Sequence, residues 1–503
     1  KVVDDRLLET RFPLRSMPFE WYAEQWKQVL EENKLSLGEV ARAIDLTAPY
    51  FKQPGVHGNL SDIALRQSCN IGPQGQRLLL ENFLPANGDF VAFYKRDFGS
   101  TGEALKDSVH FCAQTSIDAQ TLTSFLSIED CLPSLSDNVA PGSMPAASPK
   151  MFGSVFINDG TTAAMDLTAP ASGTRQFVNG SHNRFERMSR MLRLNRWLKL
   201  PPDQSDRLVI AAIRAEQRSD LIDSKVSGQP FAEKPLRITN NTLRVIGLFQ
   251  EFRLRFKCTA EQFAALIDEI SPYGRGEEAS QFDRIFNAQA LFDTPLQVDN
   301  APFSIDPQTR ADKRTIDHIC SSLGLNQEAW RYLARFVAKS HNLTEELTCS
   351  LPVLSSLYRH VLLASFLRIS PIELAALLEA LSDKGGSELL QRVLGESRVR
   401  VSGAASSGDL LSVMHAVQAC VQWCQENELS VSWLVQHVAP VIAPPLATEA
   451  DTTLLQEMHK RLQPVRLSEE ALRAAGVPGN NSQNFSGWLE LLEEVVDADG
   501  LVL

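Results

Sequence analysis

The clearest hydrophobic pattern in the chain lies between Leu351 and Asp383. Four apolar residues there occupy the i, i+3, i+7 and i+10 positions of one helix face: Leu354, Leu357, Val361 and Ala364. The pattern restarts after Ser370, which can cap a second helix with Pro371 in its first turn and Glu373 at the capping-box position. The second apolar stripe is Leu374, Leu377, Leu378 and Leu381. The segment therefore predicts two helices joined by a tight corner.

The same unit, an apolar residue and then a capping residue at a helix start, recurs along the chain. Its capping residues are Ser36, Asp118, Thr259, Asn326, Ser430 and Ser468. Each offers a side-chain oxygen to first-turn N–H groups that have no partner within the helix. The intervals run from roughly forty to over a hundred residues, so no fixed repeat period exists. We expect a mainly α fold, a large irregular array of helix-corner-helix units.

Helical periodicity also predicts where the individual helices lie. The first follows Pro18, and its apolar face includes Tyr22, Trp26, Val29 and Leu30. Further helices are expected at 74–84, 103–132, 184–200, 203–217, 240–257, 260–270, 312–323, 326–340, 345–368, 371–383, 408–427, 430–438 and 451–462.

Residues 133–180 differ in composition from the rest of the chain. They begin with a stretch rich in Pro, Ser and Ala, which is typical of a loop. Residues 155–157, Val-Phe-Ile, form the clearest strand pattern and are followed by the turn sequence Asn158-Asp159-Gly160. We expect one small β-hairpin-like insert here, with strand content confined to 150–180 apart from minor turns.

These patterns predict three regions: an N-terminal helical lobe at 1–132, the loop with its β segment at 133–180, and a main helical region at 181–503. The first ten residues, KVVDDRLLET, are too polar for the apolar core of a signal peptide. The chain starts without Met, and its last residues have an open helical pattern. We therefore expect further sequence beyond it.

Composition excludes several classes of function. The 503 residues are 44% hydrophobic and 22% charged, as in an ordinary soluble globular protein. The net charge of −12 argues against general binding of nucleic acid or anionic membranes, which requires a basic surface. The eight cysteines are scattered, so no disulfide framework is predicted. No apolar run approaches the ~18 residues of a membrane span.

A run of basic residues occupies every third position: Arg184, Arg187, Arg190, Arg193, Arg196 and Lys199. A voltage sensor shares this spacing but needs apolar residues between its arginines, whereas Glu186, Ser189 and Asn195 intervene here. The absence of an aromatic stacking platform argues against a nucleic-acid site. We expect a basic face that pairs with acidic residues elsewhere in the protein.

Two groups of side chains suggest metal binding only weakly. Cys420 and Cys424 share one helix face, with His415 and His437 nearby, but further ligands at recognisable spacing are missing. His318 and Cys320 would point to different faces of a helix. The GxSxG, GxxxxGK[ST], GxGxxG and HExxH sequences are absent. We predict no catalytic, cofactor-binding or metal-ligating residues and a non-enzymatic protein, the alternative being a hydrolase whose site carries no motif.

Four segments carry a resemblance to a known family. They are FPLRSMPFEWYAEQWKQVLEENKLSLGEV (12–40), FINDGTTAAMDLTA (156–169) together with 184–210, SQFDRIFNAQALFDTPL (280–296) and GWLELLEEVVDADGLVL (487–503). Together and in this order they resemble the A component (TcA) of bacterial insecticidal toxin complexes. The N-terminal half of that component is similar to a Salmonella plasmid virulence protein.

The resemblance implies that residues 181–503 belong to a discontinuous α-helical shell around a central channel. It implies a pore-forming, toxin-translocating subunit that forms a homopentamer, or pairs with the second chain of a split A subunit. A B–C toxin cocoon and a host cell-surface receptor or glycan would be its partners, and its location would be secreted or on the bacterial surface. This chain would then be a fragment or the N-terminal partner of a split subunit. The alternative is a helical adaptor or scaffold that binds partner proteins.

Overall fold

The computed structural model divides the chain into two compact units, Lys1–Ala439 and Pro440–Leu503. In the second unit the described residues form a short helix at 453–458 and α22 (Glu469–Ala474). The expected boundaries near residues 132 and 180 both fall inside the first unit, and the three-region division stays a prediction. The structure describes residues 20–33, 35–44, 58–81, 84, 88–143, 153–160, 163–168, 174–227, 235–288, 292–382, 386–399, 409–438, 453–458 and 469–476.

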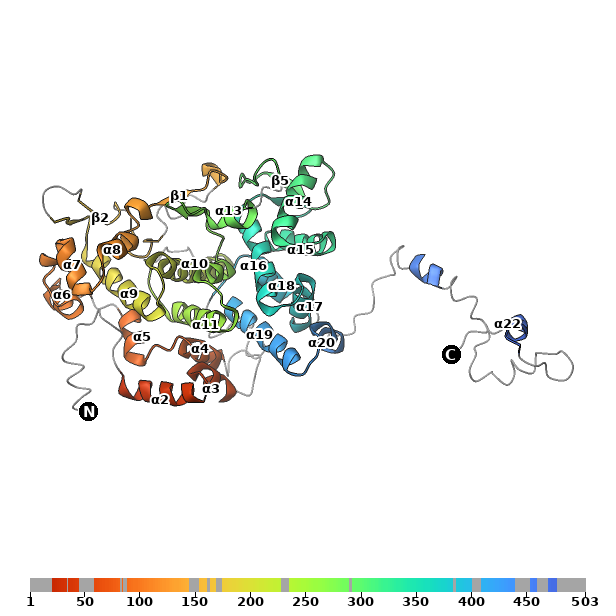
Figure 1. Cartoon of the computed structure of the whole chain (residues 1–503), viewed down its shortest axis with the longest axis horizontal. Coiled ribbons are helices and arrows are strands. Elements are labelled where there is room, and N and C mark those ends of the chain that lie inside the picture. The colour runs from red at the N-terminus through yellow and green to blue at the C-terminus, as the bar shows by residue number, and fades with distance from the viewer. Residues whose placement is uncertain are drawn as a thin grey trace. The chain divides into compact units, whose positions relative to one another are not determined.

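The first unit is mainly helical, which confirms the expected fold class (Figure 1). Its N-terminal helices are α2 (Trp21–Glu32), α3 (Leu37–Ile44), α4 (Gly58–Gln67), α5 (Pro73–Leu80), α6 (Val91–Phe98), α7 (Ser108–Thr115) and α8 (Ala119–Leu126). The middle of the chain forms α9 (His182–Leu198), α10 (Pro202–Ser227), α11 (Asn240–Phe256), α12 (Ala260–Ile267) and α13 (Gln281–Phe286). The remaining helices are α14 (Arg310–Leu323), α15 (Gln327–Ser340), α16 (Leu351–Leu367), α17 (Pro371–Leu381), α18 (Glu388–Leu394), α19 (Leu410–Glu426) and α20 (Val431–Val438).

Helices α10 and α11 form the centre of the first unit. Helix α10 packs against α8, α9, α11 and α12, and α11 packs against α4 and α19. The apolar side chains of α11 from Leu243 to Phe252 are fully buried, and those of α10 are buried from Leu208 to Ala215. Because these two stretches bury apolar side chains on most sides of the helix, they are stable only when other helices enclose them.

Five corners between helices share one backbone pattern. A residue with positive φ ends the first helix, an apolar residue follows, and a capping residue starts the next helix. The N–H of the apolar residue bonds back to a carbonyl in the preceding helix, while the cap accepts an N–H from the following one. The corners are Ser116-Ile117-Asp118, Lys257-Cys258-Thr259, Gly324-Leu325-Asn326, Arg368-Ile369-Ser370 and Glu428-Leu429-Ser430. Ser36 also caps its helix as expected, and Ser468 lies outside the described residues.

The corner at Ser370 confirms the prediction made from the apolar stripes. Helices α16 and α17 meet at 94°, and the Ser370 and Glu373 side chains form the expected capping box. Leu354, Leu357 and Leu377 are buried in the core. Among the described residues no single helix is long and apolar enough to span a membrane. Only the bent pair of α16 and α17, taken together, has the length and the apolar composition of a span.

The β structure differs from the expectation. Three short antiparallel pairs join β1 (Pro133–Leu135) to β4 (Tyr273–Arg275), β2 (Asp166–Leu167) to β3 (Phe177–Val178) and β5 (Pro302–Ser304) to β6 (Glu346–Thr348). The prediction that strands are confined to 150–180 is therefore wrong. Residues 155–157 form turns rather than a strand, because the buried Asp206 carboxylate accepts the N–H groups of Val155 and Phe156.

Two helix predictions also need correction. The helix expected at 103–132 is broken by residues with positive φ at Ser116 and Ser127 and by new caps at Asp107 and Asp118. The helix expected from 345 begins at Leu351, because 346–348 form β6. The apolar face of α2 does not pack on the core, and only Leu30 of this helix is buried.

We predict that Gly247→Ala weakens the attachment of the N-terminal helices. The added methyl carbon would lie 1.8 Å from the Leu65 carbonyl oxygen, where α4 crosses α11. We expect a loss of about 1–3 kcal/mol in the free energy of unfolding, although alanine favours a helix over glycine by about 1 kcal/mol. Urea unfolding measures this change. Gly142→Ala is the control, since its methyl group has no atom within 4 Å, and equal stability of the two variants would contradict the crowding argument.

Candidate functional site: a buried arginine network

The basic residues of α9 all have partners within the protein. Arg187 pairs with Asp159 at 2.8 Å, Arg190 with Glu186, and Arg193 with Asp97 at 3.6 Å. Arg184 donates instead to the carbonyls of Ala163 and Asn179, and Arg196 to that of Thr115. Pairing with acids elsewhere in the protein is thus confirmed for Arg187 and Arg193, whereas the partner of Arg190 lies within α9. The basic residues of α9 do not form a solvent-exposed face, since Arg184, Arg190 and Arg193 are buried.

Arginines in the first unit repeatedly donate to the C-terminal carbonyls of neighbouring helices. These carbonyls have no partner within their own helix and carry the negative end of its dipole, so a cation stabilises them. The arginine and acceptor pairs are Arg190 with Leu79 of α5, Arg196 with Thr115 of α7, Arg275 with Ser124 of α8, Arg253 with Leu198 of α9, Arg218 with Ile267 of α12, and Arg359 with Val393 of α18.

A deeply buried part of this network surrounds Arg359 of α16. Its guanidinium donates to the carbonyls of Val393 at 2.9 Å, Gly395 at 2.8 Å and Asp268 at 3.1 Å. It thereby joins the C-terminal ends of α12 and α18. Burial lowers the pKa of Arg359 to about 10, and the nearby Arg218 guanidinium contributes to that shift. The residue still carries its charge at neutral pH.

Arg218 of α10 supports the same junction from the other side. It bonds to an Asp268 carboxylate oxygen at 2.7 Å, to the Ser397 carbonyl at 3.0 Å and to the Ile267 carbonyl at 3.1 Å. Burial and the adjacent Asp268 raise the pKa of Glu269, whereas the surrounding arginines oppose that shift. The cluster is held by charge-assisted hydrogen bonds, which are stronger than neutral ones.

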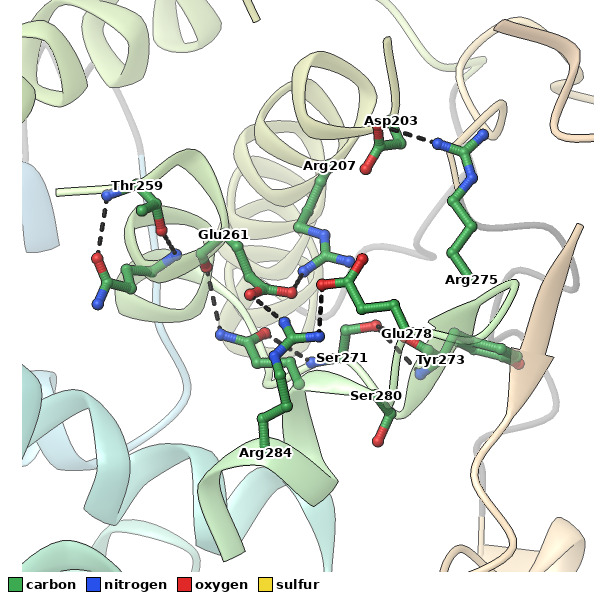
Figure 2. A network of polar contacts seen from close by, with 12 residues as sticks. Asp203, Arg207, Thr259, Glu261, Ser271, Tyr273, Arg275, Glu278, Ser280 and Arg284 are labelled. Atoms are coloured by element: carbon green, nitrogen blue, oxygen red, sulfur yellow. Dashed lines mark hydrogen bonds and ion pairs between the residues drawn. The ribbon is translucent and has the colours of Figure 1, made fainter. Parts of the chain in front are cut away.

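A second ion-pair cluster joins α10, α12, β4 and α13. Figure 2 shows Arg207 and Arg284 converging on the Glu261 carboxylate, and the Glu278 carboxylate also pairs with Arg284. Burial lowers the pKa of Arg207, an effect that Glu261 partly offsets. Because one carboxylate receives two guanidinium groups from different elements, the cluster fixes the positions of these elements relative to each other.

A cavity of about 50 Å³ lies beside this second cluster. Arg275 lines it and bonds to Asp203 at 3.0 Å (Figure 2). It also donates to the Cys131 carbonyl at 2.9 Å. The volume suits a few water molecules and is far below that of an ordinary substrate pocket. Its three arginines and three carboxylates are paired with one another or with neighbouring carbonyls, so we interpret the cluster as structural.

Of the side chains considered as metal ligands, Cys420, Cys424 and His415 lie on α19, His437 on α20, and His318 and Cys320 on α14. Cys424 is buried, Cys420 is half-buried, and burial raises the pKa of both thiols, which keeps them protonated. His318 bonds to the Phe286 carbonyl, and His437 to the Trp433 carbonyl. Within the described ranges no three His, Cys, Asp or Glu side chains are grouped so that they could hold a metal ion.

The chain shares sequence with characterised toxin proteins. Residues 1–118 match the family described as Salmonella virulence plasmid 28.1kDa A protein. Toxin subunit YenA1 of Yersinia entomophaga is 29% identical over 352 residues, which cover 67% of this chain and 28% of that protein. The structure of Morganella morganii TcdA4 matches the fold over 90% of this chain and 22% of its own, with 13% identity and a TM-score of 0.57.

The chain is similar to the A subunits of Tc toxins. It spans about a quarter of the length of the relatives that it matches. The likeness to TcdA4 concerns the fold alone. The similarity to Tc toxin A subunits supports a structural role in a toxin complex. The buried arginine network agrees with such a role, because it joins helices and carries no reactive group.

Sequence periodicity found the arginines of α9 but not the network centred on Arg359. The sequence around Arg359 predicts an ordinary apolar helix that carries a single arginine. Its acceptors are carbonyls of residues 268, 393 and 395, which are distant in the chain and carry no side-chain signal. An arginine within an otherwise apolar stripe was the only feature of the sequence that pointed to this network.

We predict that Arg359→Met is strongly destabilising. The change removes three hydrogen bonds and leaves the Asp268 and Glu269 carboxyl groups short of a counter-charge. Removing one partner from a set of buried charged contacts in this way costs about 3–5 kcal/mol of unfolding free energy. Arg335→Met is the matched control, since its side chain is 69% exposed and lies 3.6 Å from Asp306. Chemical denaturation should show almost no loss for the control, and a similar small loss for Arg359→Met would refute the structural importance of this cluster.

His360 introduces a pH dependence at the corner between α16 and α17. Its Nε2 lies 2.8 Å from the Pro371 carbonyl and must donate to it, while its buried Nδ1 has no hydrogen-bond partner among the described residues. Burial lowers the pKa of His360 to about 4, although the bond to Pro371 opposes this shift. The unfolded chain, with a pKa near 6.5, binds the proton more readily, so this contribution to stability is lost as the pH falls from 6.5 through 4.

We predict that His360→Gln reduces the loss of stability on acidification. An amide can donate to the Pro371 carbonyl but does not titrate. From the pKa values of about 4 and 6.5, the wild type should lose about 2 kcal/mol between pH 7 and pH 5 through His360. Urea unfolding of both proteins at the two pH values isolates this contribution, because all other titrating groups are shared. An equal drop in the variant would exclude His360 as the cause.

Proposed function

We propose that the chain forms part of the helical shell of the A subunit of a Tc-type toxin complex. In this role it is a non-enzymatic component of a pore-forming subunit that translocates a toxin. Similarity to toxin subunit YenA1 over two thirds of the chain is the observation that carries the proposal. The mainly helical fold and its buried ion pairs support it, because they suit a rigid wall better than a reacting site.

The proposal includes partners and location. The chain assembles with copies of itself into a homopentamer, or with the second chain of a split A subunit. The assembled A component binds a B–C cocoon and a host cell-surface receptor or glycan, and it acts outside the bacterial cell. The net charge of −12 supports recognition of proteins rather than of nucleic acid.

Electron microscopy of the full chain, alone and with the remaining subunits of a Tc toxin, tests this proposal. We expect the chain to enter bell-shaped particles with five-fold symmetry that bind the B–C cocoon. Lys106→Met should assemble like the wild type, because it alters only an exposed side chain. Failure to enter particles with any toxin subunit would contradict the proposal. Hydrolase activity in a broad substrate screen would contradict the non-enzymatic role.

A further inference from the structure

Helix α2 presents an aromatic face to the outside of the first unit. Tyr22, Trp26 and Val29 lie at i, i+4 and i+7 and are 75%, 62% and 52% exposed. The opposite side of α2 is attached to the unit by polar contacts. The Glu20 carboxylate accepts the N–H of Gln74 at the start of α5, and the Lys27 ammonium lies 5.2 Å from the centre of the Trp197 ring. These contacts hold the aromatic face away from the core.

The aromatic rings and the charges of α2 indicate which kind of partner surface would cover this face. Large aromatic side chains in the open are the residues that most often anchor protein interfaces. Trp and Tyr rings attract cations, above all the guanidinium group of arginine. Helix α2 carries three glutamates against one lysine, and Glu32 is exposed beside the aromatic face. An anionic membrane would be repelled by these charges, whereas a helix with a row of arginines would complement them.

The chain itself carries such a helix. On α15, Arg331, Arg335 and Lys339 lie at i, i+4 and i+8 and are exposed. Successive residues of this row are about 6 Å apart along the helix, as are Tyr22 and Trp26 on α2. Arg331 and Arg335 lie 3.4 and 3.6 Å from Asp306, but exposed pairs of this kind contribute little and can be exchanged for a better partner.

We propose that the aromatic face of α2 (Tyr22, Trp26, Val29) binds the basic row of α15 (Arg331, Arg335, Lys339) of a second copy of this chain. Helix α2 lies along the lower edge of the first unit and α15 at its right-hand edge (Figure 1), too far apart for one copy to close this contact on itself. The contact joins two different surfaces and is therefore heterologous, which generates a ring or an open chain of subunits. The inference rests on the proposed self-assembly and names the surfaces that carry it.

Two variants of the full chain test the contact. Tyr22→Ala/Trp26→Ala removes the aromatic face, and Arg331→Glu/Arg335→Glu reverses the basic row. All four side chains are exposed, so both variants should fold with unchanged helical content and unfolding midpoint. Sedimentation velocity should show wild-type assemblies larger than dimers. Each variant alone should associate at least about 30-fold more weakly, as expected for the loss of an interface anchor.

Mixing the two variants gives the decisive result. Each retains one intact face, so an equimolar mixture should form dimers and nothing larger. Trp423→Ala, which removes another exposed tryptophan, should assemble like the wild type. A wild type that stays monomeric at its highest soluble concentration would overturn the proposal, as would a mixture that forms no dimers or forms larger species.

Membrane binding and a different mode of assembly would each give a distinct result. Flotation of the wild type, but not of Tyr22→Ala/Trp26→Ala, with vesicles of zwitterionic lipid would assign the aromatic face to a membrane and overturn the contact between copies. Normal five-fold toxin particles from both variants would overturn the contact and leave the proposed function intact. Loss of self-association in the variants, together with a wild type that binds no other toxin subunit, would support the contact and contradict the proposed function.

Discussion

The constraint on which this structure depends is that many short helices have many ends. Each helix leaves four carbonyls and four N–H groups without partners inside the helix, and burying them unpaired would be costly. The chain meets this constraint in two ways. Local corners combine a positive-φ residue with a cap, as at Arg368-Ile369-Ser370. Where ends face another helix, an arginine from that helix supplies the donors, as Arg359 does for α12 and α18.

The arginine network also determines which helices lie together. A guanidinium group has five donors in a fixed plane, so it can join several carbonyls only in one arrangement. Arg244 illustrates this with the buried pair to Asp409, whose carboxylate also caps α19. Separating α11 from α19 would break this ion pair, whereas the cap lies within the start of α19 and would remain. Burial of apolar area favours compactness, whereas these contacts favour one particular packing.

An interior in which apolar burial gives compactness and charged contacts give one packing suits a structural part of a larger assembly. The described interior is occupied by paired ions and apolar side chains, and the cavity beside Glu261 is too small for an ordinary substrate. The unusual chemistry lies at the surface, where α2 exposes aromatic rings and α15 exposes cations. Similarity to toxin subunits that are several times longer agrees with a chain whose surfaces meet other protein.

The sequence by itself determined most of the longer helices and the capped corners between them, because periodicity, caps and the Ser370–Glu373 box act over a few residues. It also carried the resemblance to toxin A subunits and the pairing of the α9 arginines. Only the tertiary structure decided that residues 155–157 form turns, since the deciding group is the Asp206 carboxylate some fifty positions away. The same holds for the strand pairs, for Arg359 and its backbone acceptors, and for the outward aromatic face of α2. Backbone carbonyls are identical in every residue, so a site built on them leaves no pattern in the sequence.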